Sequence, residues 1–382
     1  MSHNRNIIIC NLGNTDNDPR PKRMLEFYKS KKFQAFVCSD KSANDSFIEL
    51  TFKDLRNSSS FLNFFLRNTL KILRKIVISN FIKDFLNSIL FGYIGLSKKM
   101  KSQEFDIIFC HDIYLLDFAL SLKKKSRKAK VFFDAREYYP EQFQDSFSFK
   151  FLETNERRRI LKKNIHKVDK FFTVSENLRS EYKKEFDRTP DLMMSLPFKM
   201  DLNVQKTTQS LVRIVHHGVA NRNRQIEKMM KIVDKADSKF KFDLFLTGDK
   251  KYIQFLKMFE TDRIKIRPAI DFSQIIQTLN GYDIGFFYVE PTTKNLEFCL
   301  PNKFFEFIQA RLAVFTGPSI EMKNLIDKYN CGFYSQDFSI ENATEKLDSI
   351  SMSQLQTLKE NSNAASKFLC FEEQVKNLNL DK

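Results

Sequence analysis

The 382-residue sequence has no tryptophan and only nine glycines, and the common glycine-rich motifs are missing from it. It contains no strict G-x-G-x-x-G, no Walker loop and no G-x-S-x-G elbow, so nicotinamide-binding proteins, P-loop proteins and serine hydrolases lack their signatures here. The longest uncharged apolar stretch in the middle of the chain, residues 85–97, has 13 residues, whereas a membrane-spanning helix needs about 20. The sequence therefore predicts no membrane span.

Metal ligands are scarce as well. The six cysteines are scattered without a C-x-x-C pair, and most lie in apolar runs, which is typical of reduced thiols in a reducing compartment. Only five histidines occur, and the adjacent His216 and His217 would point to opposite faces of a strand. Residues 1–10 lead directly into a strand-like run without the features of a signal peptide. We therefore expect a cytoplasmic protein without a metal site.

Acidic residues are outnumbered, because 63 lysines and arginines against 47 aspartates and glutamates give a net charge of +16. Much of the excess lies in residues 61–101, where Asp84 is the single acid. The eight cations there are Arg67, Lys71, Arg74, Lys75, Lys83, Lys98, Lys99 and Lys101. Apolar residues recur between them at helical spacing, which predicts a basic amphipathic helix. Either its basic face lies on an anionic membrane surface, or its apolar face packs into the core and its basic face is solvated.

Strand-like runs alternate with helical patterns in both halves of the chain, which predicts α/β architecture with parallel sheets. The expected strands are residues 6–12, 33–38, 106–110, 130–134, 171–174, 212–217, 242–247, 264–268, 283–289 and 313–316. The polar stretch after Pro197 has no hydrophobic period and is interpreted as a linker. We expect two doubly wound, Rossmann-like domains facing a cleft. Their predicted bounds are 1–198 with a helical insert at 61–101, a linker at 199–210, 211–366, and a C-terminal helix at 367–382.

The most informative segment runs from Asn295 to Phe307. Asn302 is positioned to cap a helix, so the N–H groups of the first turn, with Lys303 beside them, would form an anion site for a diphosphate. Glu306, one turn further, could accept hydrogen bonds from the hydroxyls of a ribose. The alternative is that Glu306 only complements the helix dipole and Lys303 is solvated.

Four segments together resemble motifs of one family. Leu300–Glu306 is similar to "LPNKxFE", and residues 217–227 are similar to "hGxxxxnRgiE". Residues 133–141 are similar to "yDxhElyPe", and Val174-Ser175-Glu176 is similar to "vSe". The order and the separation of these motifs also agree with that family. From Asp106 to about Leu325, the chain resembles the two-domain glycosyltransferases of the GT-B fold, specifically the retaining family-four group that uses nucleotide-diphosphate sugars.

The resemblance implies a donor site on the C-terminal domain, with the base near the loop before Pro268. Its catalytic cations would be Arg224 and Lys303, which stabilise the diphosphate leaving group without a metal. The other donor-binding residues implied are Gly218, Arg222, Asn302, Glu306 and Glu297. Of these, Glu306 would hold the ribose, and Glu297 is one position from Phe298, where the family has its first glutamate. The family reaction is a front-face displacement in which the departing phosphate deprotonates the acceptor.

Polar residues at the carboxyl edge of the first sheet are the candidates for the acceptor side. They are Asp16, Asp18, Arg20, His111 and Asp112, and the alternative is an ordinary polar turn. The resemblance adds Arg136, which stands at the position of a family histidine, and its neighbour Glu137 as catalytic candidates. Residues 371–374 resemble the family's terminal motif, which implies that the last helix returns to the N-terminal domain.

The sequence and the resemblance thus predict a retaining, metal-independent glycosyltransferase with a nucleotide-diphosphate sugar as co-substrate and no cofactor. The acceptor is expected to be a glycan or a lipid-linked molecule in bacterial surface polysaccharide synthesis. An anionic membrane surface on the cytoplasmic side is the expected further partner. A non-catalytic GT-B-like partner subunit and a sugar-nucleotide epimerase stay open as alternatives. Nucleic acid is not an expected partner, because no recognised nucleic-acid module occurs.

Overall fold

The computed structural model describes residues 5–52, 55–56, 60–100, 102–207 and 211–380. The ends of three predicted segments therefore lie outside the described residues, namely Lys101 of the insert, residues 208–210 of the linker and residues 381–382 of the last helix. The chain forms two compact units that meet in sequence between Met193 and Met194.

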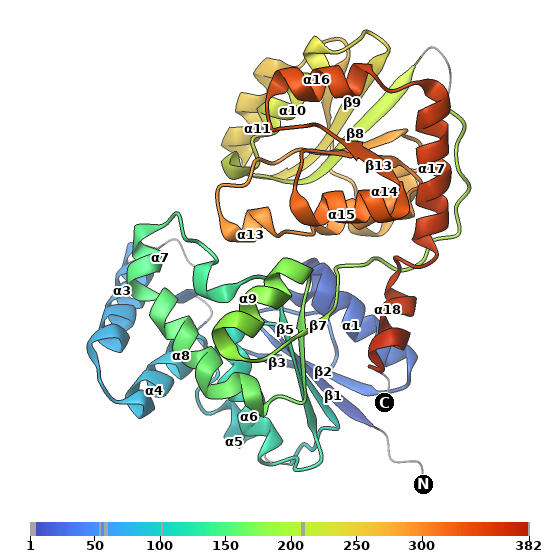
Figure 1. Cartoon of the computed structure of the whole chain (residues 1–382). Coiled ribbons are helices and arrows are strands. Elements are labelled where there is room, and N and C mark those ends of the chain that lie inside the picture. The colour runs from blue at the N-terminus through green and yellow to red at the C-terminus, as the bar shows by residue number, and fades with distance from the viewer. Residues whose placement is uncertain (1–4, 53–54, 57–59, 101, 208–210, 381–382) are drawn as a thin grey trace. The chain divides into compact units, whose positions relative to one another are not determined.

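The first unit is built on a seven-stranded sheet with the order β3-β2-β1-β4-β5-β6-β7, and all its paired strands are parallel (Figure 1). The strands are β1 (Asn6–Cys10), β2 (Gln34–Ser39), β3 (Phe47–Glu49), β4 (Ile107–Cys110), β5 (Lys130–Ala135), β6 (Lys170–Thr173) and β7 (Asp191–Leu192). The central run Ile7-Ile8-Ile9-Cys10 is fully buried, as expected of a parallel strand covered on both faces. Ile8 pairs with Phe36 on one side and Ile108 on the other.

Helices connect and cover these strands. They are α1 (Pro19–Ser30), α3 (Phe61–Ile76), α4 (Asn80–Leu90), α5 (Leu96–Lys99), α6 (Leu116–Lys123), α7 (Phe147–Leu152), α8 (Thr154–Asn164) and α9 (Glu176–Phe186). α1 begins with Asp18 at its N-cap and Pro19 at its first position, a favourable pair for starting a helix. α1 packs against β1 and β2, and α6 packs against β4 and β5.

The second unit has a six-stranded parallel sheet with the order β10-β9-β8-β11-β12-β13. The strands are β8 (Val212–Ala220), β9 (Phe240–Gly248), β10 (Ile264–Arg267), β11 (Ile284–Phe287), β12 (Ala313–Thr316) and β13 (Gly332–Tyr334). The helices are α10 (Ile226–Lys235), α11 (Lys250–Leu256), α12 (Ile275–Leu279), α13 (Lys294–Glu297), α14 (Asn302–Gln309), α15 (Ile320–Tyr329), α16 (Ile340–Asp348), α17 (Met352–Ser366) and α18 (Phe371–Leu378). The predicted pair of doubly wound α/β units is confirmed.

Successive side chains along the strands of the second sheet belong to two separate apolar cores. Ile214 and Phe286 pack with helices α10, α11 and α16, whereas the adjacent Val215 and Phe287 pack with α14 and α15. The helices of the two layers lie on opposite faces of the sheet (Figure 1). The sheet thereby fixes where β8 ends and α14 begins, and this is where the donor residues were predicted.

Helix α18 hydrogen-bonds to the beginning of the same unit. The N–H of Phe371 donates to the carbonyl of Pro197 at 2.8 Å, and the side chain of Gln374 donates to the carbonyl of Met194 at 2.9 Å. The first and last segments of the second unit are therefore tied to each other. The return of this helix to the N-terminal domain stays a prediction.

Helix α3 corrects the prediction for the basic insert. The helix forms, but several of its cations bind groups of the protein. Arg74 is 1% exposed, Lys71 pairs with Glu153 at 2.6 Å, and Lys75 donates to the carbonyl of Phe151 at 2.6 Å. The interpretation that the apolar face packs into the core is therefore wrong, because that face is exposed. Contact of this segment with a membrane surface stays a prediction. No helix within the described ranges is both long and apolar enough to span a bilayer.

Candidate functional site

The centre of the candidate donor site is the contact between Gly218 on β8 and Lys303 in the first turn of α14. Gly218 has φ +118°, a conformation that side chains rarely adopt, and a Cβ there would stand 3.0 Å from the Nζ atom of Lys303. β8 and β11 are neighbours in the sheet, and α14 follows β11. The site therefore lies where the order of the strands reverses, which is where ligands bind in doubly wound sheets.

Lys303 is buried without a polar partner. It is 5% exposed, and among the described residues its Nζ finds no hydrogen bond. The nitrogen lies 5.1 Å from the centre of the Phe287 ring. Burial, with the nearby Arg224 as second cause, holds the pKa of Lys303 well below its usual range, although Glu306 acts in the opposite direction. Binding of an anion beside such a buried amine is therefore strongly favourable.

The two predicted arginines behave differently. Arg224 ends a short 3-10 turn after β8, and its burial near Lys303 lowers its pKa. Arg222 is exposed and lies over the rings of Tyr252 and Phe255, at 5.4 and 5.5 Å. The structure therefore brings Arg224 to the lysine, whereas Arg222 contacts aromatic side chains of α11.

Glu306 lies one turn along α14 and is also buried. The Oε2 atom of Glu306 is 3.2 Å from the Nε2 atom of His217 on β8. The Nδ1–H group of the neighbouring His216 donates to the carbonyl of Phe286 at 2.8 Å, and burial holds the pKa of His216 well below the usual range. His216 therefore stays neutral and packed in the core, while His217 lies on β8 beside Glu306.

The start of α14 differs by one residue from the prediction. Pro301 occupies the N-cap position with no side-chain hydrogen bond, and Asn302 is the first helical residue. The first-turn N–H groups are thus not capped by a side chain. Glu297 ends α13 and is exposed, and the adjacent Phe298 is half-buried.

In the first unit, Arg20 and His111 converge on Asp134, which is completely buried. The Nε of Arg20 donates to Asp134 Oδ2 at 2.9 Å, and Nη1 donates to the carbonyl of Met193 at 2.9 Å. The Nδ1 of His111 lies 2.9 Å from the same Oδ2. Burial alone would raise the pKa of Asp134, but Arg20 and His111 outweigh it and lower the pKa. Arg20 and His111 were predicted to face an acceptor. In the structure both are buried and bind the carboxylate of Asp134.

The other acceptor-side residues gather where β1, β4 and β5 end. Arg136 donates to Asp18 at 2.6 Å, and this carboxylate outweighs burial and raises the pKa of Arg136. Burial raises the pKa of Glu137 and of Asp112, and the Asp112 carboxylate also accepts from the N–H of Tyr114 at 2.9 Å. This edge therefore presents one ion pair and two carboxyl groups that hold protons more tightly than usual.

Asp16 and Asp18 have the spacing of an Asp-x-Asp pair, but their carboxylates point to different partners. Asp16 accepts from the N–H of Ala43 at 2.9 Å, whereas Asp18 binds Arg136. Within the described ranges, no group of three or more His, Cys, Asp or Glu side chains is placed to hold a metal ion.

Sequence reasoning missed two residues of these sites. His217 and Asp134 both belong to motifs that carried the resemblance, but neither was assigned a role. Their signal was positional, because each lies in the second half of a strand, toward its carboxyl end, where ligands bind in doubly wound sheets. Asp134 has two partners from other segments, Arg20 and His111, and they could not be predicted from its own surroundings in the sequence.

Comparison with solved structures decides the architecture. HepE of Anabaena, in complex with UDP and glucose, superposes with a TM-score of 0.69 at 9% identity, over 99% of each chain. The sucrose-phosphate synthase of Thermosynechococcus elongatus gives 0.66 at 10% identity, over 98% of each chain. The trehalose 6-phosphate synthase of Burkholderia multivorans gives 0.65 at 10% identity, over 99% of this chain and 96% of the other.

The chain has the GT-B fold. No protein-family model matches the sequence, and no curated protein does. In GT-B terms, the unit that ends at Met193 is the N-terminal domain, and the unit that begins at Met194 is the C-terminal domain. The fold predicted from the four motifs is therefore confirmed.

Proposed function

We propose that this chain is a glycosyltransferase that takes a sugar from a nucleotide-diphosphate donor bound on its second unit. One observation carries the proposal, namely the buried and unpartnered amine of Lys303 at the uncapped start of α14, beneath Gly218. Burying such a group without a partner costs free energy, and a diphosphate would supply the missing charge and acceptors. The N–H groups of the first helical turn add a second source of attraction for an anion.

The likeness to other GT-B proteins supports this function. Two of the similar structures are complexes of Anabaena HepE, one with UDP and glucose and one with UDP-glucose. The others named above are a trehalose 6-phosphate synthase and a sucrose-phosphate synthase. A nucleotide sugar is therefore the donor class that we propose for this chain, with the base near the loop before Pro268.

The proposed reaction uses cations rather than a metal at the leaving group. Departure of the nucleoside diphosphate builds negative charge, which Arg224, protonated Lys303 and the start of α14 would stabilise. Glu306, which lies beside His217, would accept from the ribose hydroxyls, and Glu297 would approach the sugar. We propose a retaining front-face displacement, in which the departing phosphate takes the proton of the acceptor hydroxyl and no protein base is needed.

The acceptor is proposed to be a glycan or a lipid-linked molecule of bacterial surface polysaccharide synthesis, on the cytoplasmic side of a membrane. Arg136 paired with Asp18, and the carboxyl groups of Glu137 and Asp112, supply hydrogen-bonding groups for hydroxyls at one sheet edge. Because Glu137 holds its proton more tightly than an ordinary glutamate, it could donate as well as accept a hydrogen bond.

The test is hydrolysis and transfer with a panel of radiolabelled sugar nucleotides, with and without a lipid-linked acceptor. Lys303→Met should weaken nucleoside diphosphate binding by about 10-fold or more, because a charge-assisted contact is lost. The matched control is Lys250→Met, which removes an exposed lysine from α11 of the same unit. Equal affinities of wild type and Lys303→Met would contradict the donor site.

A non-catalytic partner subunit is the second candidate. It is favoured by Phe298 at the position of the family's first glutamate and by Arg136, which is engaged with Asp18 and cannot act as a base. Tight binding of a nucleoside diphosphate, without hydrolysis or transfer of any donor in the panel, would favour this alternative.

A further inference from the structure

Helix α3 is amphipathic, but its apolar side faces outward and Arg74 on its polar side is buried. Phe61, Phe65, Ile72 and Ile76 share one side of the helix and are 82, 60, 48 and 68% exposed. Lys71 and Arg74 lie on another side, against the protein, whereas Lys75 is exposed beside the apolar residues. A surface helix of a water-soluble protein does the reverse and buries its apolar stripe. The arrangement of α3 therefore indicates that its outer face does not meet water alone.

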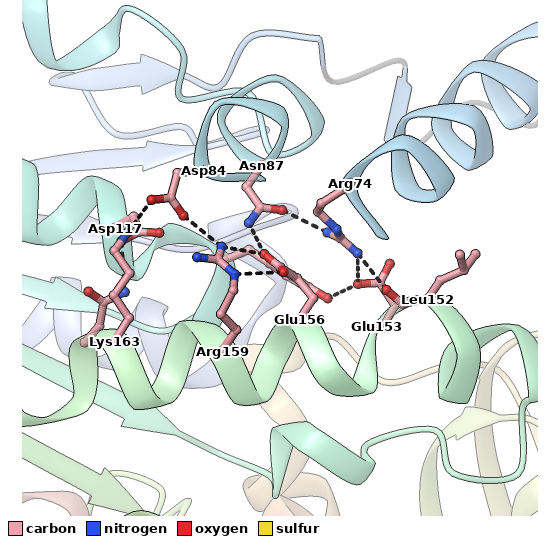
Figure 2. Close-up of polar contacts among 11 residues, drawn as sticks. Arg74, Asp84, Asn87, Asp117, Leu152, Glu153, Glu156, Arg159 and Lys163 are labelled. Atoms are coloured by element: carbon pink, nitrogen blue, oxygen red, sulfur yellow. Dashed lines mark hydrogen bonds and ion pairs between the residues drawn. The ribbon is translucent and has the colours of Figure 1, made fainter. Parts of the chain in front are cut away.

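The inner face of α3 is held by a polar network rather than by an apolar core (Figure 2). Arg74 donates to Asn87 of α4 at 2.8 Å and to Glu153 at the start of α8, also at 2.8 Å. Asn87 in turn donates to Glu156 of α8 at 2.6 Å. These contacts are buried, and they fix which side of the helix points outward.

The same network continues along α4 and α8. Asp84 accepts from Arg159 at 2.8 Å and from Lys163 at 2.6 Å, and Lys163 also reaches Asp117 of α6 at 2.7 Å (Figure 2). Asp84 is the single acid between residues 60 and 100, so none of the acidic charge of this stretch is left on its outer side. The α3–α4 hairpin is thus attached through charge pairs that would be lost if it turned over.

Exposed apolar side chains extend from α3 over its neighbours α4 and α7, both of which contact it. We call this surface the apolar face. Its members are Phe61, Leu62, Phe64, Phe65, Leu66, Ile72, Leu73, Ile76, Ile78, Phe81, Ile82, Phe85, Phe147 and Phe151. They are fourteen of the twenty-one large apolar side chains that are exposed in the described part of the chain. Monomeric soluble proteins rarely expose such a concentration without a partner.

We propose that the apolar face inserts into one leaflet of an anionic lipid bilayer, so that the protein is held at the membrane by buried phenylalanines, leucines and isoleucines. The face is long and rich in phenylalanine, but no helix in the described ranges can cross the bilayer, which suits a surface-lying rather than a spanning helix. This inference concerns an interaction surface and does not depend on the proposed sugar transfer.

Charge complementarity favours a lipid surface over a second protein. Lys75 lies 3.0 Å from the centre of the Phe151 ring, and Lys150 stands between Phe147 and Phe151 on α7. Lys83 follows the exposed Phe81 and Ile82 on α4. The cations interleave with the apolar side chains, and long lysine stems can place the ammonium at headgroup level while the rings insert.

The experiment uses the full chain, whose lack of tryptophan makes a single introduced indole an unambiguous probe. Phe65→Trp places it on the apolar face, and Phe272→Trp places it on an exposed site of the second unit as the matched control. With vesicles that contain anionic lipid, the emission of Phe65→Trp should shift to the blue and be quenched by brominated acyl chains. The emission of Phe272→Trp should do neither.

Flotation of the same vesicles gives an independent measurement. Phe61→Ser, Phe65→Ser, Ile72→Ser and Ile76→Ser together should reduce binding at least about 10-fold, since each removes buried apolar area. Replacing Met258, Phe272 and Phe368 by serine should not, because these exposed side chains lie outside the face. Added salt should weaken binding only partly, whereas binding by cations alone would be abolished.

Three results would overturn the proposal. The first is wild-type protein that stays with the soluble fraction in the presence of anionic vesicles at low salt. The second is quenching of Phe65→Trp no greater than that of Phe272→Trp. The third is a stable dimer of the wild type, seen by sedimentation, that the four serine substitutions dissociate, because the face would then join two copies. Nucleoside diphosphate affinity, measured in parallel, reports on the donor site alone.

Discussion

The Nζ atom of Lys303 lies 3.0 Å from the point that a Cβ atom would occupy at Gly218. Because Gly218 has no side chain, space is left beside the amine of Lys303. Both residues belong to the second unit, at the end of β8 and the start of α14. This relationship can be tested from either side.

Gly218→Ala should weaken nucleoside diphosphate binding and lower stability. Alanine is strained at φ +118°, and its methyl group would press on Lys303, so we expect a cost of about 1–3 kcal/mol in unfolding free energy. Urea denaturation and calorimetric titration measure the two effects. Gly281→Ala is the control, because φ is not in the left-handed region there and the nearest atom to its Cβ is 3.6 Å away. Equal losses in both variants would contradict the argument.

Binding of a nucleoside diphosphate should take up a proton. In the free protein burial lowers the pKa of Lys303, so a fraction of the amine is neutral, and an adjacent diphosphate would raise that pKa again. Calorimetry near pH 8, in two buffers with different ionisation enthalpies, measures the proton uptake, since the phosphates themselves are deprotonated there. Lys303→Met should abolish the uptake. An uptake that persists in this variant would assign it to another group.

Arg20→Met should destabilise the first unit by about 3–5 kcal/mol, because it leaves the buried Asp134 carboxylate without its main counter-charge. The control is Arg267→Met, which removes a pair with Asp243 in which the arginine is 50% exposed and which should be worth about 0–1 kcal/mol. Chemical denaturation compares them. If Arg20→Met lowers the unfolding free energy only slightly, Arg20 would again be a candidate for contact with the acceptor.

The attachment of the α3–α4 hairpin should weaken in acid. Burial alone would raise the pKa of Glu153, but Arg74 and Lys71 lower it to about 2. Because the folded pKa is below the unfolded one, the pair stabilises the fold above about pH 5, and this contribution is lost progressively as the pH falls toward 2. The difference in unfolding free energy between wild type and Glu153→Gln should therefore be largest near pH 7 and shrink by pH 3. A difference that is constant with pH would show that Glu153 does not titrate as inferred.

The strands that sequence reasoning found are those with long apolar runs, such as β1 around Ile8. The strands it missed, β3, β7 and β13, have three, two and three residues. Such short edge strands contain too few residues to display a period, and they are recognisable only once a neighbouring strand is in place. The donor residues Gly218, Arg224, Lys303 and Glu306 could be predicted because they lie in motifs whose positions relative to β8 and α14 follow from the chain itself.

The orientation of α3 could not be predicted in the same way. Helical spacing separates Arg74 from Phe65 into two faces, but it does not say which face is inside. That was decided by Asn87 and Glu153, which lie 13 and 79 residues away in the sequence from Arg74. The pairing of Arg20 was missed for the same reason, since its partner Asp134 is 114 residues away. Pairing between buried polar groups that lie far apart in the sequence leaves no local sequence pattern from which it could be predicted.

The inverted hairpin also has a practical consequence for anyone who handles the protein. In plain buffer its phenylalanine-rich surface offers each molecule a patch on which other molecules can stick, so concentrated samples should become polydisperse. A mild detergent above its micelle concentration should cover that patch and restore a single species. The amount of detergent carried by the purified protein would then be a direct gauge of how much of α3, α4 and α7 is normally kept out of water.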